Sequence, residues 1–165
     1  MTCTYDAIML LSFGGPEGPA DVIPFLENVT RGRDIPAERL LEVADHYLQF
    51  GGISPINPQN RLLIDKLGSE LAQRGNVTPI LFANRNWHPL LEDTVRNAVD
   101  AGYQRILVLV TSAFSSYSGC RQYLDDLDRA SSGFGQSAPV FHKIRPFYNS
   151  PGFISAVQDN LGRSI

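Results

Sequence analysis

The sequence has little cysteine, no excess of positive charge and no long hydrophobic run. Its two cysteines are Cys3 and Cys120, and Cys3 falls in an N-terminus expected to fray, so a reducing cytoplasm is predicted rather than a structural disulfide. A net charge of −3 gives no basic field for phosphates, so nucleic acid is not an expected partner. No run approaches the ~20 apolar residues of a membrane helix, and the N-terminus does not resemble a signal peptide. These features favour a globular protein without a membrane span.

Several common catalytic and metal-binding motifs are also missing. The sequence contains no G-x-G-x-x-G, G-x-x-x-x-G-K-[ST], H-E-x-x-H, C-x-x-C or G-x-S-x-G. None of His46, His88 and His142 has a partner at metal-ligand spacing. The residues alone therefore identify neither a metal site nor a catalytic group.

Strands and helices alternate along the 165 residues, which suit one domain. The apolar pattern predicts strands over Tyr5–Phe13, Thr78–Ala83, Arg105–Val110 and Val140–Ile144. Helices are expected over Ala20–Val29, Pro36–Phe50, Gln59–Arg74, Leu90–Ala101, Ser118–Ala130 and Pro151–Leu161. Leu62, Leu63, Leu67 and Leu71 are expected to face the core, and Gly133–Ala138 to form a polar loop. The pattern predicts an α/β fold, a Rossmann-like or flavodoxin-like parallel sheet with helices on both faces.

In such a sheet, ligands bind at the carboxyl ends of the strands. The residues expected there are Ser12-Phe13-Gly14, Asn84-Arg85-Asn86-Trp87-His88, Thr111-Ser112-Ala113 and Arg145-Pro146-Phe147-Tyr148. This aromatic and basic set suits a flat ligand with carboxylates, because rings stack on aromatic faces and arginines bind carboxylates with two hydrogen bonds.

Two turns near this edge allow more than one interpretation. Gly14-Gly15-Pro16 is consistent with a phosphate cradle or with a tight turn that simply needs glycine. Arg31-Gly32-Arg33 is consistent with a clamp for a carboxylate or with a solvated turn. The residues alone leave the first pair of alternatives open and favour the solvated turn for the second.

Five motifs, in their order and spacing, resemble those of ferrochelatases, which insert ferrous iron into a porphyrin. They are LLSFGGPE (residues 10–17), PFLENVTRGR (24–33), HYLQFGGISPI (46–56), NRNWHP (84–89) and SAFSSYSGCRQY (112–123). Each motif is weak by itself, but their combination covers nearly the whole chain. The residues of these motifs are most similar to those of the actinobacterial branch, whose members resemble coproporphyrin ferrochelatases.

The resemblance implies a fold of two Rossmann-like domains with a porphyrin cleft between them. Residues 1–165 would be the N-terminal domain, with the C-terminal domain absent from this chain. The positions implied to contact the porphyrin are Phe13, Thr30, Arg31, His46, Tyr47, Ser54 and Tyr123. Phe13 stands where many relatives carry a tyrosine that approaches the metal, and Thr30 where some carry an arginine. Cys120 resembles the first of four ligands of a [2Fe–2S] cluster.

The implied reaction places ferrous iron, as substrate, in coproporphyrin III or protoporphyrin IX during haem biosynthesis. The histidine and glutamate that the family uses for catalysis are expected beyond Ile165, so this chain alone is expected to be inactive. Its expected partners are the porphyrin and either the missing C-terminal half or a second copy of the chain. The alternatives are a small cobalt- or nickel-type chelatase acting as a homodimer, and a flavodoxin-like binding module without catalysis.

Overall fold

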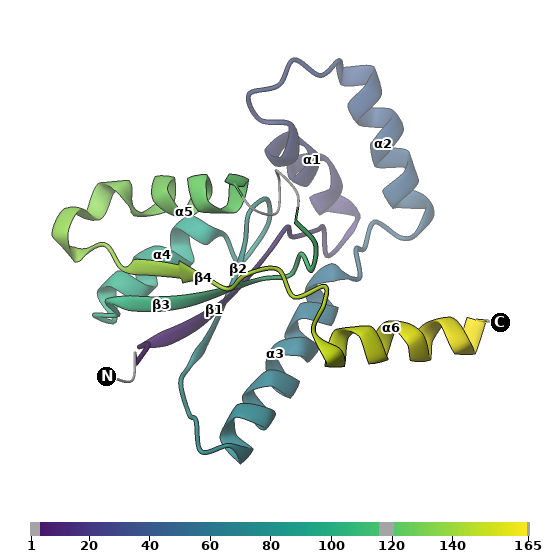
Figure 1. Ribbon diagram of the computed structural model, residues 1–165. Coiled ribbons are helices and arrows are strands. Elements are labelled where there is room, and N and C mark those ends of the chain that lie inside the picture. The colour runs from purple at the N-terminus through teal and green to yellow at the C-terminus, as the bar shows by residue number, and fades with distance from the viewer. Residues whose placement is uncertain (1–3, 116–120, 165) are drawn as a thin grey trace.

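The centre of the molecule is a parallel β-sheet (Figure 1), seen in a computed structural model that describes residues 4–115 and 121–164. Its strands are β1 (Ala7–Ser12), β2 (Ile80–Asn84), β3 (Arg105–Val110) and β4 (Val140–Lys143). They are all parallel and lie in the order β2-β1-β3-β4. This is the order of a flavodoxin-like sheet, in which the direction of strand addition reverses between β1 and β3. The predicted α/β class is confirmed.

The sheet has helices on both faces, as the sequence predicts. Figure 1 shows α4 (Leu91–Asp100) and α5 (Tyr123–Ser131) on one side and α3 (Ile56–Gln73) on the other. Alternate side chains of a strand point to opposite faces, so Met9 and Leu11 face α4 and α5 while Leu10 faces the α3 side. All three side chains are fully buried, and each such burial contributes about 1.5–3 kcal/mol.

Two helices form a separate lobe beyond the carboxyl ends of the strands. A short 3₁₀ turn (Pro19–Asp21) leads into α1 (Val22–Thr30), which packs on α2 (Ala37–Gln49). The lobe has its own small core, of Val22, Phe25, Leu26 and Ala44. We call this part the α1–α2 lobe.

The last helix, α6 (Pro151–Ser164), projects from the sheet (Figure 1). None of its residues is buried, and Ile154, Val157 and Leu161 are 40 to 59% exposed. Their spacing puts the three side chains on one face of the helix. In residues 4–115 and 121–164, no helix has the length and apolar character needed to cross a bilayer.

The expected inward orientation of Leu62 and Leu63 is wrong, because these side chains are 56% and 42% exposed. The inward stripe of α3 instead follows Asn57, Asn60, Ile64, Leu67 and Leu71, which recur every three or four residues. Leu62 and Leu63 fall outside this stripe.

The polar loop expected over Gly133–Ala138 is instead a 3₁₀ helix, Ser132–Ser137. The Ser132 hydroxyl donates to the Arg129 carbonyl oxygen over 2.9 Å, which continues the turns of α5. Polar composition alone does not distinguish such a serine-containing helical extension from a loop. The expected start of α5, at Ser118, lies outside the described residues.

Candidate ligand-binding face

Three loops meet at the carboxyl ends of β1 and β2. The first loop (residues 13–18) follows β1, the second loop (50–55) joins α2 to α3, and the third loop (85–90) follows β2. The Ser54 N–H donates to the Pro16 carbonyl oxygen over 2.8 Å, and the Asn86 N–H donates to that of Phe13 over 3.2 Å. The three loops are therefore joined directly through their backbones.

Glycine allows the first and second loops to approach this closely. A Cβ atom placed on Gly15 would lie 2.6 Å from both the Cβ and the Oγ of Ser54. A Cβ on Gly52, whose φ is +71°, would lie 2.5 Å from the Cα of Pro19. The close approach explains these glycines without a phosphate, and so favours the tight-turn interpretation.

Aromatic side chains from four segments pack together beside the loops. The Phe25 ring lies edge-to-face with those of Phe13, Tyr47 and Trp87, at centroid distances of 6.2, 5.9 and 6.3 Å. We call these four residues the aromatic wall. Phe13 remains 39% exposed, so the wall presents a ring to solvent at the end of β1.

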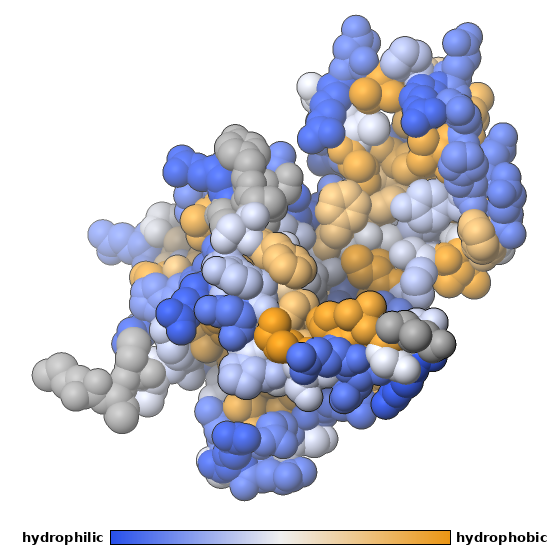
Figure 2. Space-filling model, turned by 45° about the vertical axis from the view of Figure 1, so that its right-hand side comes forward, coloured by the Kyte–Doolittle hydropathy of each residue, from blue (hydrophilic) through white to orange (hydrophobic). Residues whose placement is uncertain are grey.

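An apolar hollow of about 370 Å³ opens next to the aromatic wall. It brings together three of the residues predicted to contact a porphyrin, His46, Tyr47 and Ser54. Two further lining residues, Phe50 and Ile53, are 80% and 52% exposed, although neither was among the predicted contacts. Figure 2 shows apolar side chains on the α1–α2 lobe and along α6, with a hollow between them.

A second, polar pocket of about 800 Å³ lies between the end of α1 and the start of α5. Its charged lining residues are four arginines and three carboxylates: Arg31, Arg33, Arg85, Arg129, Glu92, Asp125 and Asp126. Arg31 donates to the Oδ1 of Asn28 over 2.5 Å, and within the described residues neither Arg31 nor Arg33 forms an ion pair with a carboxylate. The pocket therefore holds two arginines that are available to an anionic ligand.

The deeper arginine of this pocket is already paired. Arg85 and Asp126 form an ion pair, with side chains only 15% and 8% exposed. The Arg85 guanidinium also lies 4.8 Å from the centroid of the Tyr123 ring. Tyr123 is 6% exposed, and this burial raises the pKa of its hydroxyl. The structure thus puts Tyr123 in the core beneath Arg85 rather than on the open surface.

Of two other predicted residues, Thr30 has a hydroxyl that is already hydrogen-bonded, and Cys120 is not among the residues that the structure describes. The Thr30 hydroxyl donates to the Leu26 carbonyl oxygen over 2.8 Å, so it is engaged within α1. Cys120 lies outside the described residues. Porphyrin contact by the seven predicted residues stays a prediction.

His46 and His88 belong to the segments that form this face, whereas the third histidine, His142, lies away from it. His142 lies 3.1 Å from the Tyr5 hydroxyl, near the amino end of β1 and so at the opposite edge of the sheet from the loops. In the described part of the chain, no group of three His, Cys, Asp or Glu side chains is placed to hold a metal ion.

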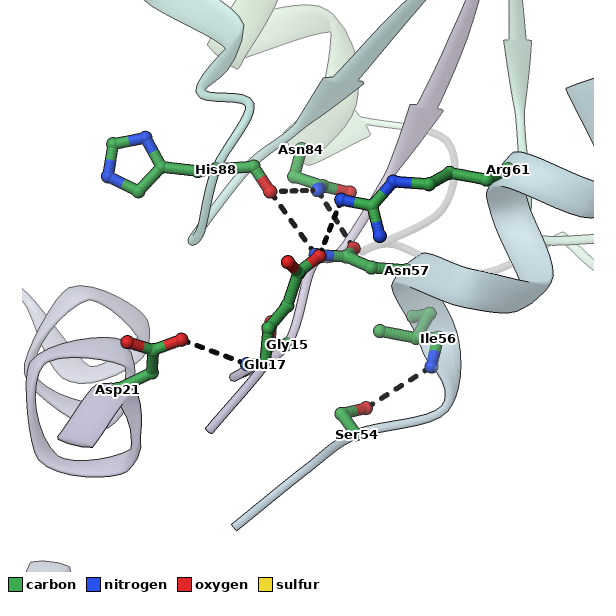
Figure 3. Close-up of polar contacts among 9 residues, drawn as sticks. All are labelled: Gly15, Glu17, Asp21, Ser54, Ile56, Asn57, Arg61, Asn84 and His88. Carbon is green, nitrogen blue, oxygen red and sulfur yellow. Dashed lines mark hydrogen bonds and ion pairs between the residues drawn. The ribbon is translucent and has the colours of Figure 1, made fainter. Parts of the chain in front are cut away.

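A buried polar network under the loops was not anticipated from the sequence (Figure 3). Asn57 and Asn84 are both fully buried, and their side chains are hydrogen-bonded to each other over 3.0 Å. Arg61 adds an ion pair to Glu17 at 2.6 Å. The sequence contained one signal for this network, which is two asparagines three residues apart, Asn57 and Asn60, on the inward stripe of a helix.

Together, these features define an α/β domain with a candidate ligand-binding face at the carboxyl ends of its parallel strands. The sequence profile of the Ferrochelatase family matches residues 5–165. The chain belongs to the ferrochelatase family.

Curated relatives cover almost all of this chain. The coproporphyrin III ferrochelatase of Streptomyces coelicolor is 55% identical over 164 residues, covering 98% of this chain and 44% of the relative. That of Mycobacteroides abscessus is 53% identical over 161 residues, covering 98% and 47%. The ferrochelatase of Rhodopirellula baltica is 51% identical over 160 residues, covering 97% and 46%. The chain thus spans about half the length of these relatives.

Proposed function

We propose that this chain forms one wall of a porphyrin cleft in an enzyme that inserts ferrous iron into coproporphyrin III. The observation that carries the proposal is the pairing of an aromatic wall and apolar hollow with an arginine-lined pocket along one edge of the sheet. A porphyrin is a flat apolar ring with carboxylates at its edge, so it needs both kinds of surface. Two of the relatives are named for coproporphyrin III, which favours that tetrapyrrole.

The proposed contacts divide between the two surfaces. Phe13, Tyr47 and Ser54 face the macrocycle from the first and second loops and α2, with His46 beside them. Arg31 binds a propionate through two charge-assisted hydrogen bonds. Thr30 and Tyr123 are the weaker members of the predicted set, because the hydroxyl of the first is engaged and the second is buried.

A flavodoxin-like binding module is less well supported. A flavin phosphate would need the free N–H groups of the first loop. The Glu17 N–H instead donates to the Oδ2 of Asp21 over 3.0 Å, and the Glu17 carboxylate lies in the same loop. Two carboxylates here repel a phosphate.

Iron insertion releases two N–H protons from the porphyrin as Fe²⁺ enters, and these protons need an acceptor. A histidine is suited to this near neutral pH. We propose that the acceptor and its acidic partner belong to the part of the relatives that this chain does not match. The exposed apolar face of α6 supports such a second half, because it would be covered by it.

The proposal includes no step through an iron–sulfur cluster. A [2Fe–2S] cluster needs four protein ligands, and this chain has two cysteines. Cys120 remains proposed as one such ligand, and a cytoplasmic location remains a prediction.

The test is a spectral titration of the purified chain with coproporphyrin III, with zinc then added as a surrogate for iron. We expect a saturable shift of the Soret band and no change of the Q bands to the metallated pattern. Mixing the chain with the unmatched C-terminal part of the Streptomyces coelicolor relative should then allow metallation. Absence of a Soret shift contradicts porphyrin binding, and catalytic metallation by the chain alone contradicts the need for a second half.

A further inference from the structure

We infer that Asn57 is a positioning residue that holds the three loops of the proposed porphyrin wall in register. The inference rests on the proposed function for its consequence, but its geometry does not depend on a ligand. Asn57 lies at the start of α3, directly after the second loop, and its side chain is fully buried.

The Asn57 amide contacts both of the other loops. Its Nδ2 lies 2.9 Å from the Oε1 of Glu17 in the first loop and 3.2 Å from the carbonyl oxygen of His88 in the third. The Gly15 carbonyl oxygen lies farther, at 3.4 Å. Figure 3 shows the Asn57 side chain pointing from α3 into the space where these groups converge. One side chain therefore bonds the first and third loops and belongs to the helix that follows the second loop.

The second buried asparagine fixes the orientation of the first. Asn84, at the end of β2, donates from its Nδ2 to the Oδ1 of Asn57 over 3.0 Å and to the His88 carbonyl oxygen over 2.9 Å. The Asn57 Oδ1 is thus an acceptor, and its NH₂ group must face Glu17 and His88.

The loops that Asn57 joins also carry the ligand-facing residues. Phe13 opens the first loop, Ser54 lies in the second, and Trp87 precedes His88 in the third. A displacement of the His88 carbonyl therefore moves Trp87 relative to Phe25, on which its ring packs. Asn57 sets the shape of the aromatic wall although it does not reach the proposed ligand.

The substitution Asn57→Asp tests this role with almost no change of volume. It removes both donated hydrogens and places a carboxylate against the Glu17 carboxylate and the His88 carbonyl oxygen, with Arg61 as the nearby cation. The chain has one tryptophan, so its fluorescence reports on the third loop alone. We expect the Trp87 emission of N57D to shift to the red and its quenching by acrylamide to rise.

Asn60→Asp is the matched control. Asn60 lies one turn later on the same inward stripe, is 5% exposed, and its Nδ2 has no hydrogen-bond partner among the described residues. N60D buries the same carboxyl but should leave the Trp87 signal unchanged. If N57D and N60D give the same Trp87 spectrum, the positioning role is wrong.

A rescue variant separates a specific bond from general damage. In the double variant N57D/E17Q, the amide and the carboxylate exchange places, so a donor again faces an acceptor. The Trp87 signal should return toward that of the wild type, and a signal no closer to it than that of N57D contradicts the inference. Should N57D fail to fold by circular dichroism, N57S replaces it, because its short hydroxyl cannot reach Glu17 and His88.

The ligand consequence is measured separately by titration with coproporphyrin III. We expect N57D to weaken binding about tenfold, which equals about 1.4 kcal/mol, and N60D to bind as the wild type does. If the wild type does not bind, the proposed function fails while the Trp87 comparison still decides the positioning role. If N57D alters Trp87 but binds normally, the loops are held by Asn57 but do not form the porphyrin wall.

Discussion

Gly15→Ala should weaken the fold by forcing the first and second loops apart. The added methyl would lie 2.6 Å from the Cβ and Oγ of Ser54 and 2.9 Å from the Cγ2 of Ile56. The Ser54 Cβ cannot turn away, because it is attached directly to a backbone that is held by the 2.8 Å hydrogen bond to Pro16. Relief of the contact therefore requires a backbone shift of the second loop.

The expected cost follows from this geometry. Overpacking of a well-filled site that requires a backbone shift costs about 1–3 kcal/mol, and we expect the free energy of unfolding to fall by that amount. Gly18→Ala is the control in the same loop. Gly18 has extended backbone and no atom within 4 Å of a Cβ placed on it, so G18A should be neutral or stabilising by up to about 1 kcal/mol.

The assay is urea unfolding of the wild type, G15A and G18A, followed by circular dichroism and fitted with a common slope. For a chain of this size, a loss of 1 kcal/mol also lowers the melting temperature by about 2–4 °C. Coproporphyrin III binding by G15A should weaken as well, because Ser54 moves. Equal stability of G15A and G18A would refute the conclusion that the two loops are in backbone contact.

Two further predictions concern charged groups. Asp126→Asn should lower the free energy of unfolding by about 3–5 kcal/mol, because it leaves Arg85 buried without its partner. Asp125→Asn, at an exposed ion pair, should change it by less than about 1 kcal/mol. Urea unfolding measures both losses, and equal losses contradict the reasoning. The pKa of Asp6 lies below its ordinary value of 3.8 because the backbone N–H groups of Gln104 and Arg105 donate to the carboxylate. Its contribution is therefore complete above pH 3.8 and is lost as the pH falls through the lower folded-state value. Asp6→Asn should be less stable than the wild type at neutral pH and equal to it in acid, and a gap that persists in acid contradicts this.

The fold could be predicted because its main signals are local. The strand Arg105–Val110 is a continuous apolar run, and the same residues form β3. The details that failed depend on tertiary contacts. Leu62 and Leu63 have the composition of a core stripe, but α3 is oriented so that Asn57 and Asn60 are buried instead, and Asn57 enters the polar network.

The candidate face was only partly predictable. Motif order identified His46, Tyr47 and Ser54, which the structure brings to one hollow. It could not identify Asn57, because a buried asparagine is recognised by the atoms around it, and those come from segments about 30 to 40 residues away. Nor could it show that Tyr123 lies beneath Arg85, since that contact also joins distant segments.

The rigidity of the three loops has a consequence for the proposed chemistry. Metal insertion needs the macrocycle to bend, so that its nitrogen lone pairs become accessible, and the energy for this bending comes from binding. A wall that yields to the flat ring would use the binding energy to deform itself instead. The glycine contacts at Ser54, the backbone bonds between the loops and the Asn57 network all stiffen the same surface. We therefore expect G15A and N57D, each placed in a full-length relative, to reduce the rate of metal insertion more than they reduce porphyrin affinity. A loss confined to affinity would mean that the wall binds the ring without bending it.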